Sequence, residues 1–165
     1  MKFLFVFFFS MIAAAQTPLK MITEGDLAIP SYKFDEFSAF LEKSDDTVYV
    51  INFWATWCAP CIKELPAFEK LGEKYRSQNV KVLLVSLDFS SQAQKSLIPF
   101  IKKRKLKNEV VHLVSTDAND WIGNVSPNWS GAIPATVIYS RTKRQFYERS
   151  FTFDELESEL KSFLP

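Results

Sequence analysis

The sequence has few of the residues on which metal and phosphate sites depend: two cysteines, one histidine and four glycines in 165 residues. A structural zinc site needs about four nitrogen or sulfur ligands, and the two cysteines with His112 do not supply them. His112 lies in a strand pattern, where a core histidine with satisfied hydrogen bonds is the simpler interpretation. With so little glycine, no phosphate-binding loop is visible. We therefore expect neither a metal nor a cofactor.

The sequence also lacks an excess of either charge, with 20 Lys and Arg against 19 Asp and Glu. This balance gives no reason to expect binding to nucleic acid or to an anionic membrane. The densest basic run, KKRK at 102–105, suits the end of a helix, where cations oppose the negative end of the dipole.

What is present begins with an N-terminal pattern for export. Lys2 precedes an apolar run over residues 3–12, and three alanines follow at 13–15. This layout predicts a secretory signal peptide over residues 1–15 and a mature protein, of a size that suits one domain, over residues 16–165. The run is short for a membrane span, which needs about 20 apolar residues; an uncleaved anchor is the alternative. We expect a periplasmic or otherwise extracytoplasmic protein, soluble after cleavage.

Five segments have the β-branched and aromatic character of strands. The first, VYVINFWA, has almost no polar break, which suits a central strand buried on both faces. The next strand, reached through a helix, would complete a βαβ unit. The last two, joined by a short polar link, indicate an antiparallel hairpin. The predicted strands are residues 48–55, 80–88, 110–116, 135–140 and 144–150.

Helices are predicted before, between and after these strands. Apolar residues at helical spacing indicate a short helix over 34–41, and a long helix containing Pro66 follows the cysteines. Two later helices open on the spacing of a capping box. The alternation of strands and helices predicts an α/β sheet flanked by helices. The two proposed capping boxes are Ser91 with Gln94 and Thr152 with Glu155.

Cys58 and Cys61 lie between the first predicted strand and the long helix. A structural disulfide, half of a metal site and a redox centre are the alternatives. A crosslink stabilises more when it closes a longer loop, and this loop is very short. At a helix N-terminus, by contrast, free N–H groups and the dipole stabilise a thiolate. We therefore expect Cys58 to be the exposed nucleophile and Cys61 the shielded resolving thiol.

Three features together resemble the thioredoxin fold: FWATWCAPC at 53–61, a proline five residues further on at Pro66, and GAIPATVIY at 131–139. More narrowly, they resemble the exported TlpA/ResA-type thiol–disulfide oxidoreductases, over residues 27–164. The resemblance implies a central mixed sheet of four to five strands flanked by helices, with a redox-active disulfide.

Two positions depart from plain thioredoxin. Asn52 stands where thioredoxins hold a buried aspartate that helps to move protons, and an amide cannot titrate. Glu64 stands where plain thioredoxin is apolar, and a glutamate there is a feature of the ResA-type proteins. Because positions i and i+3 lie on one face of a helix, its carboxylate can lie near Cys61. We expect Glu64 to be a proton partner of the cysteine pair; an ordinary exposed helix glutamate is the alternative.

The resemblance also implies a substrate-binding surface around the cysteines. It predicts a cis peptide bond between Ile133 and Pro134, in a loop that presents backbone to a bound substrate segment. Trp57 could form an apolar platform for a partner. The expected substrate-binding residues are Trp57, Ala59, Pro60, Ile133 and Pro134. The other roles expected near the site are core for Trp54, groove border or packing for Trp129, and turn or cap for Asp88.

These observations favour a protein-disulfide reductase acting on exported proteins. In oxidising members of the superfamily a histidine precedes the second cysteine, and here that position is Pro60. A disulfide oxidase or isomerase is one alternative, and a binding module on a thioredoxin scaffold is another. By resemblance, the partners would be protein disulfides and thiols, with a membrane thiol carrier as electron donor. We expect a monomer that binds no nucleic acid.

Overall fold

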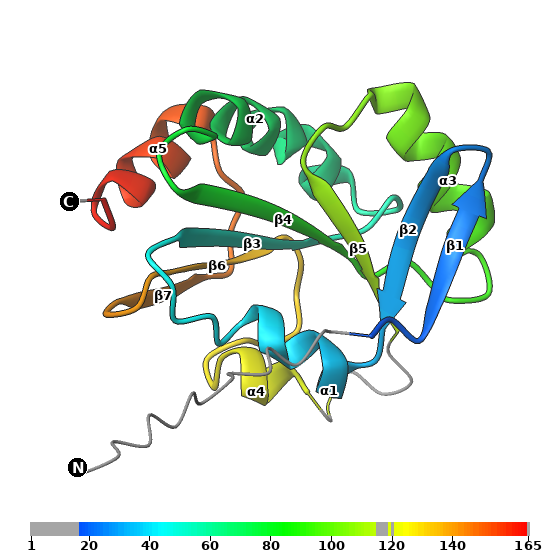
Figure 1. Ribbon diagram of the computed structural model, residues 1–165, viewed down its shortest axis with the longest axis horizontal. Helices are drawn as coiled ribbons and strands as arrows, with labels where there is room; N and C mark the ends of the chain where they lie inside the picture. The colour runs from blue at the N-terminus through cyan, green and yellow to red at the C-terminus, as the bar shows by residue number, and fades with distance from the viewer. Residues whose placement is uncertain (1–16, 115–118, 120, 165) are drawn as a thin grey trace, which may run out of the picture.

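The computed structural model describes residues 17–114, 119 and 121–164; the predicted signal peptide, residues 1–15, lies outside them. Seven strands form one mixed sheet in the order β1-β2-β5-β4-β3-β6-β7 (Figure 1). The strands are β1 (Lys20–Glu24), β2 (Leu27–Tyr32), β3 (Val48–Trp54), β4 (Val80–Ser86), β5 (Glu109–Leu113), β6 (Ala135–Tyr139) and β7 (Arg144–Tyr147). The helices are α1 (Phe34–Phe37) with a 3-10 turn (Ser38–Phe40), α2 (Ala59–Tyr75), α3 (Ala93–Arg104), α4 (Ile122–Val125) and α5 (Phe153–Lys161).

The sheet has more strands than the four to five expected from the sequence, because β1 and β2 add a hairpin at one edge. These strands are antiparallel and joined by a two-residue turn, in which Gly25 has a φ of 61° that glycine adopts readily. β2 then pairs in parallel with β5 through Ser31 and Tyr32. Only Ile22 of β1 is buried, so this segment lacks the apolar alternation by which a strand is recognised.

The central strand expected over 48–55 is β3, in which all seven residues are buried. β4 lies parallel to β3 on one side and β6 lies antiparallel on the other. The predicted hairpin of β6 and β7 is present as well. Because side chains of a strand point alternately to both faces, a strand buried throughout needs a packed layer on each face.

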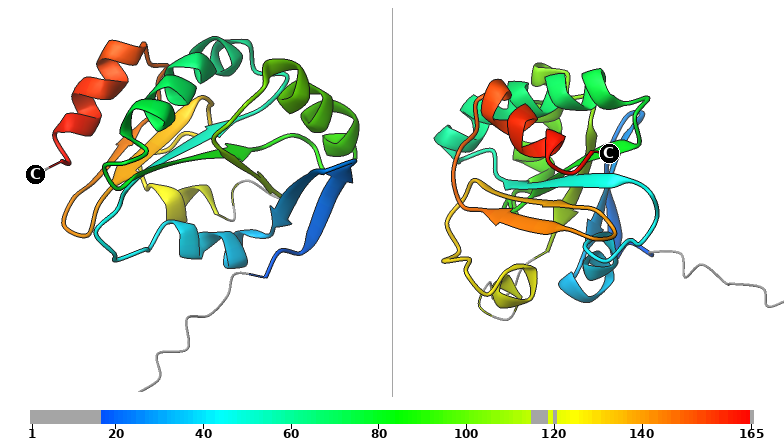
Figure 2. Two further views of the ribbon diagram at one scale, coloured as in Figure 1. Left: turned by 45° about the horizontal axis from the view of Figure 1, so that its top comes forward. Right: turned by 90° about the vertical axis from the view of Figure 1, so that its left-hand side faces the viewer.

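Helices provide those two layers (Figures 1 and 2). α2, α3 and α5 cover one face of the sheet, and α1 and α4 cover the other. Trp54 and Leu71 belong to the first core cluster, and Phe37 and Phe53 to the second. The junction between β3 and α2, which carries both cysteines, is therefore held between two packed cores.

Two features of the helices agree with the sequence prediction, and one differs from it. α2 contains Pro66 as expected, and the capping box of Thr152 and Glu155 opens α5. The box predicted for Ser91 and Gln94 is wrong, because α3 begins after Gln92 without a side-chain cap. Gln94 instead donates its Nε2–H to the carbonyl oxygen of Thr23 in β1, at 3.3 Å. Over residues 17–114, 119 and 121–164, every helix is too short or too polar to cross a bilayer.

Candidate active site

The cysteine pair lies where β3 passes into α2. Cys58 is the N-cap residue of α2 and Cys61 lies in the first turn, as does Pro60. A disulfide joins the two cysteines, with 5.3 Å between their Cα atoms. The backbone N–H of Cys61 donates a hydrogen bond to Cys58 Sγ at 3.3 Å. After reduction, the same N–H and the helix N-terminus would stabilise a thiolate on Cys58.

Cys58 is the more accessible of the two cysteines, but it is less open than the sequence predicts. Cys58 is 5% exposed and Cys61 is 0% exposed. The carbonyl oxygen of Ile133 lies 3.7 Å from Cys58 Sγ, and the bond from Ile133 to Pro134 is cis. The expectation of an exposed Cys58 is therefore corrected, because the loop that carries Ile133 and Pro134 packs against its sulfur.

Glu64 is buried on α2, one turn after Cys61, with 3% of its surface exposed. The alternative of an ordinary exposed helix glutamate is therefore wrong. Its carboxylate accepts hydrogen bonds from Asn52 Nδ2 at 2.8 Å and from the backbone N–H of Phe151 at 2.9 Å. Burial raises the pKa of Glu64 to about 7, although both hydrogen bonds and the charge of Arg149 act to lower it. A carboxyl group with a pKa near 7 can take up and release protons at neutral pH.

Asn52, in the middle of the site, is 0% exposed. Its Nδ2 donates to Glu64 and also, at 3.2 Å, to Thr136 Oγ1. Its Oδ1 has no hydrogen-bond partner within the described part of the chain. An amide that cannot titrate thus lies in direct contact with a carboxyl group that can, and the titratable group comes from α2 instead of from β3.

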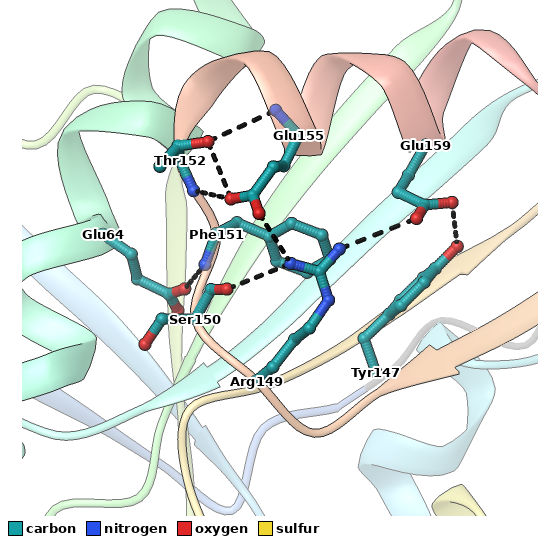
Figure 3. A network of polar contacts seen from close by, with 8 residues as sticks. All are labelled: Glu64, Tyr147, Arg149, Ser150, Phe151, Thr152, Glu155 and Glu159. Atoms are coloured by element: carbon teal, nitrogen blue, oxygen red, sulfur yellow. Dashed lines mark hydrogen bonds and ion pairs between the residues drawn. The ribbon is translucent and has the colours of Figure 1, made fainter.

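The link between β7 and α5 supplies the backbone contact to Glu64 (Figure 3). Arg149 in this link places its guanidinium carbon 4.0 Å from the centroid of the Phe151 ring. The same guanidinium pairs with Glu155 at 3.5 Å and with Glu159 at 3.6 Å. Two carboxylates and a ring therefore contact the exposed Arg149 side chain, close to the residue whose N–H contacts Glu64.

A buried carboxylate, Asp88, connects the cysteine loop to the end of β4. Asp88 is 3% exposed and accepts hydrogen bonds from the Thr56 backbone N–H at 3.2 Å, from the Thr56 hydroxyl and from Ser86 Oγ at 2.7 Å. Its role is wider than the turn or cap expected from the sequence, since it fixes a residue two positions before Cys58. Thr56 and Asp88 are 32 residues apart, and no sequence pattern announces their contact.

Two exposed aromatic rings stack on each other at Trp57, the residue before Cys58. Trp57 is 57% exposed and Phe89 is 64% exposed, and they stack with 5.9 Å between centroids and 19° between planes. Ala59 and Pro60, on the other side of Cys58, are exposed as well. Trp57 thus lies where an apolar platform was expected. Phe89 extends this platform. No motif in the sequence points to Phe89, and its place directly after the end of a predicted strand was the available indication.

His112 is a core residue, as predicted. It is 0% exposed, with Nδ1 at 2.9 Å from Ser31 Oγ and Nε2 at 2.9 Å from the carbonyl oxygen of Asp88. Burial lowers the pKa of His112. Among the residues that the structure describes, no cluster of three or more His, Cys, Asp or Glu side chains could hold a metal ion.

The two other tryptophans near the site are structural. Trp54 is 0% exposed and belongs to the core, as expected. Trp129 packs 4.9 Å from the ring of Phe53 and donates its Nε1–H to the Ala132 carbonyl oxygen at 2.8 Å. Of the two roles considered for Trp129, packing beneath the loop that leads to Pro134 is the one observed.

Fold and site together define a thioredoxin-like protein with a cysteine pair at the N-terminus of a helix. The sequence profile of the AhpC/TSA family matches residues 26–144. The chain belongs to the AhpC/TSA family.

Two similar sequences and one similar solved structure agree with this assignment. The chain is 34% identical to sporulation thiol-disulfide oxidoreductase A of Bacillus subtilis over 93 residues, which are 56% of this chain and 48% of that protein. It is 26% identical to the thiol-disulfide oxidoreductase ResA of Oceanobacillus iheyensis over 167 aligned positions, covering 95% of this chain and 81% of the relative. The crystal structure of StoA from Bacillus subtilis superposes with a TM-score of 0.55 at 26% identity, over 72% of this chain and 84% of that one. The match therefore spans about half of the first relative and most of the second.

Proposed function

We propose that this protein is an extracytoplasmic thiol–disulfide oxidoreductase that reduces disulfides of exported proteins through the dithiol of Cys58 and Cys61. The observation that carries the proposal is the disulfide itself. It lies at the N-terminus of α2, with the Ile133 carbonyl oxygen 3.7 Å from Cys58 Sγ. The names of the two relatives, both thiol-disulfide oxidoreductases, support the same chemistry.

In the first step, the Cys58 thiolate attacks one sulfur of a substrate disulfide. A bond forms between Cys58 Sγ and that sulfur, the substrate disulfide breaks, and the second substrate sulfur leaves as a thiolate that takes up a proton. The exposed rings of Trp57 and Phe89 would contact the apolar surface of the substrate. The cis-proline loop would present the backbone of Ile133 to the segment around the substrate cysteine.

In the second step, Cys61 resolves the mixed disulfide. Its thiol loses a proton to Glu64, and the resulting thiolate attacks Cys58 Sγ, so that the Cys58–Cys61 disulfide forms and the substrate leaves as a thiolate. The substrate disulfide has gained two electrons and the dithiol has lost two. Glu64 suits this role because its buried carboxyl group has a pKa of about 7.

A reductase must itself be reduced after each turnover. We propose a membrane thiol carrier as the electron donor, protein disulfides as substrates, and a monomer as the working form. Export would depend on residues 1–15 as a signal peptide, leaving residues 16–165 as the mature thioredoxin-like domain. The exposed rings beside Cys58 are available to both substrate and donor, because each must reach the same sulfur.

Substitution of single cysteines tests the proposal. Cys58→Ala should abolish reduction of a model disulfide, because the nucleophile is absent. Cys61→Ala should still form a mixed disulfide but fail to release it, so that the adduct accumulates and is seen by mass spectrometry under non-reducing conditions. Equal alkylation rates of the two cysteines in the reduced protein would argue against this division of roles. A parent protein whose disulfide does not exchange at all would favour the binding module instead.

A further inference from the structure

We propose that Arg149 is a positioning residue for Glu64. It holds the link between β7 and α5 so that the Phe151 N–H meets the Glu64 carboxylate, and its charge favours the ionised form of that carboxylate. The inference rests on the role given to Glu64 under the proposed function, and adds the group that sets its protonation state.

The first support is the way in which Arg149 is fixed. Its guanidinium contacts carboxylates on two turns of α5, Glu155 at 3.5 Å and Glu159 at 3.6 Å, and donates to the Ser150 carbonyl oxygen at 3.3 Å. Its guanidinium carbon also lies 4.0 Å from the centroid of the Phe151 ring, a cation–π contact (Figure 3). These contacts tie Arg149 to α5, and thereby fix the backbone of the link between them.

The fixed backbone includes a donor to Glu64. The Phe151 N–H lies 2.9 Å from Glu64 Oε2. The next residue, Thr152, donates its own N–H to Glu155 in the capping box of α5, at 2.8 Å. Arg149 and the capping box therefore both contact Glu155. Together they fix the segment on both sides of Phe151. Loss of Arg149 would loosen one of the two hydrogen bonds that stabilise the Glu64 carboxylate.

The second support is the set of charges around Glu64. A cleft of about 540 Å³ opens between α2 and the link to α5, and Glu64 lies on its wall. Lys63 and Lys70 of α2 and Glu155 of α5 line the same cleft, while Asn52 and Thr136, from β3 and β6, are uncharged. The cleft also gives Glu64 a path to water for proton exchange.

Of the charged groups near Glu64, Arg149 is the cation that lowers the pKa of Glu64 against the effect of burial. Removal of Arg149 would raise the pKa of Glu64 in two ways. The favourable positive charge is lost, and the carboxylates of Glu155 and Glu159, which Arg149 now compensates, would further disfavour a negative charge on Glu64. Both effects raise the pKa of Glu64, so that the carboxyl group stays neutral to a higher pH.

The experiment follows the Glu64 side-chain carboxyl by ¹³C NMR through a pH titration of the full-length oxidised protein. Arg149→Gln should move the Glu64 midpoint upward by roughly half a pH unit at low ionic strength. Arg149→Lys, which keeps the charge but not the fork of contacts, should move it less. The matched control is Arg141→Gln, since Arg141 is also an exposed arginine, paired with Asp46; it should leave the midpoint unchanged. An unchanged midpoint in Arg149→Gln would overturn the proposal.

A kinetic double-mutant cycle separates this inference from the proposed function. Arg149→Gln should shift the pH profile of disulfide exchange upward when Glu64 is present, and have no further effect on the profile in the Glu64→Gln background. If Glu64→Gln alone leaves the profile unchanged, the proposed role of Glu64 fails. If Glu64→Gln changes the profile but Arg149→Gln shifts it equally in both backgrounds, the role of Arg149 fails and that of Glu64 stands.

Discussion

Glu64 couples the folding equilibrium to pH, because its carboxyl group prefers the neutral form in the folded protein. Burial raises its pKa from 4.5 to about 7. The folded state therefore holds a proton that the unfolded state has released between these pH values. The stability that comes from this proton is complete below about pH 4.5 and is lost as the pH rises through 7.

We predict that this loss amounts to about 3 kcal/mol between pH 4.5 and 8, and that Glu64→Gln abolishes it. The quantity to measure is the difference in unfolding free energy between parent and Glu64→Gln, from urea denaturation at each pH. The difference is needed because the lowered pKa of His112 acts in the opposite sense over an overlapping range. Carboxylates with lowered pKa values, such as Asp45 and Glu148, act below about pH 4.5. A pH-independent difference would show that Glu64 titrates normally.

Among the secondary-structure elements, α2 packs closely against the segment between α3 and β5 at one glycine. A Cβ atom on Gly72 would lie 1.9 Å from Oδ1 of Asn108. The Asn108 side chain is not free to move aside, because its Nδ2 donates to the Phe68 carbonyl oxygen at 2.9 Å. Gly72 is therefore required for close approach, and not for an unusual backbone conformation.

We predict that Gly72→Ala destabilises the protein by about 1–3 kcal/mol, the typical cost of an overpacked site. In an exposed helix interior the same change would stabilise by up to about 1 kcal/mol. Asn108→Ala should remove the clash, so that Gly72→Ala becomes neutral or stabilising in that background. Gly123→Ala is the matched control, since no atom lies within 4 Å of its Cβ position. Urea midpoints measure all four variants; a stabilised Gly72→Ala single variant would contradict the packing argument.

The elements that the sequence predicts well are those whose evidence is local. β3 is a continuous apolar run, α2 follows from helical spacing, and the capping box of α5 is contained in four residues. The β1–β2 hairpin is not predicted, because β1 buries only Ile22.

The same division holds for the site. The cysteine pair is visible as a motif, but its partners come from distant segments. Phe151 is 87 residues from Glu64 and Ile133 is 75 residues from Cys58. Neither separation leaves a periodic trace in the sequence, so the resemblance to known proteins was needed to expect the cis-proline loop. The i, i+3 spacing from Cys61 could place Glu64 on the same helix face, but its burial also depends on the link that brings the Phe151 N–H to its carboxylate.

For the molecule as a whole, we predict electron flow toward substrates. Strong oxidants owe their potential to a nucleophile of very low pKa. Here the residue before Cys61 is Pro60, and His112, the sole histidine of the sequence, is buried in β5 with both ring nitrogens in contact with other groups. Neither position therefore supplies an imidazolium next to the pair, and the stabilisation of the Cys58 thiolate that the described residues show is that of the α2 N-terminus.

We predict a reduction potential nearer to the thioredoxin value of about −270 mV than to the value of about −120 mV of the strong periplasmic oxidant. Equilibration of the Cys58–Cys61 pair against glutathione buffers measures it. Pro60→His should raise the potential, because an imidazolium next to the pair would stabilise the reduced form. A parent value above about −180 mV would favour the oxidase or isomerase instead.

The two edges of the sheet matter for a protein whose proposed clients are newly exported, incompletely folded chains. Such chains carry unpaired strands that can extend a foreign sheet and aggregate on it. β7 is four residues long and begins with Arg144. On β1, the Thr23 carbonyl already accepts from Gln94, and Glu24 pairs with Lys102 at 2.7 Å. Both edges therefore discourage strand addition, so that a client bound through the exposed rings of Trp57 and Phe89 can dissociate once its sulfur is released.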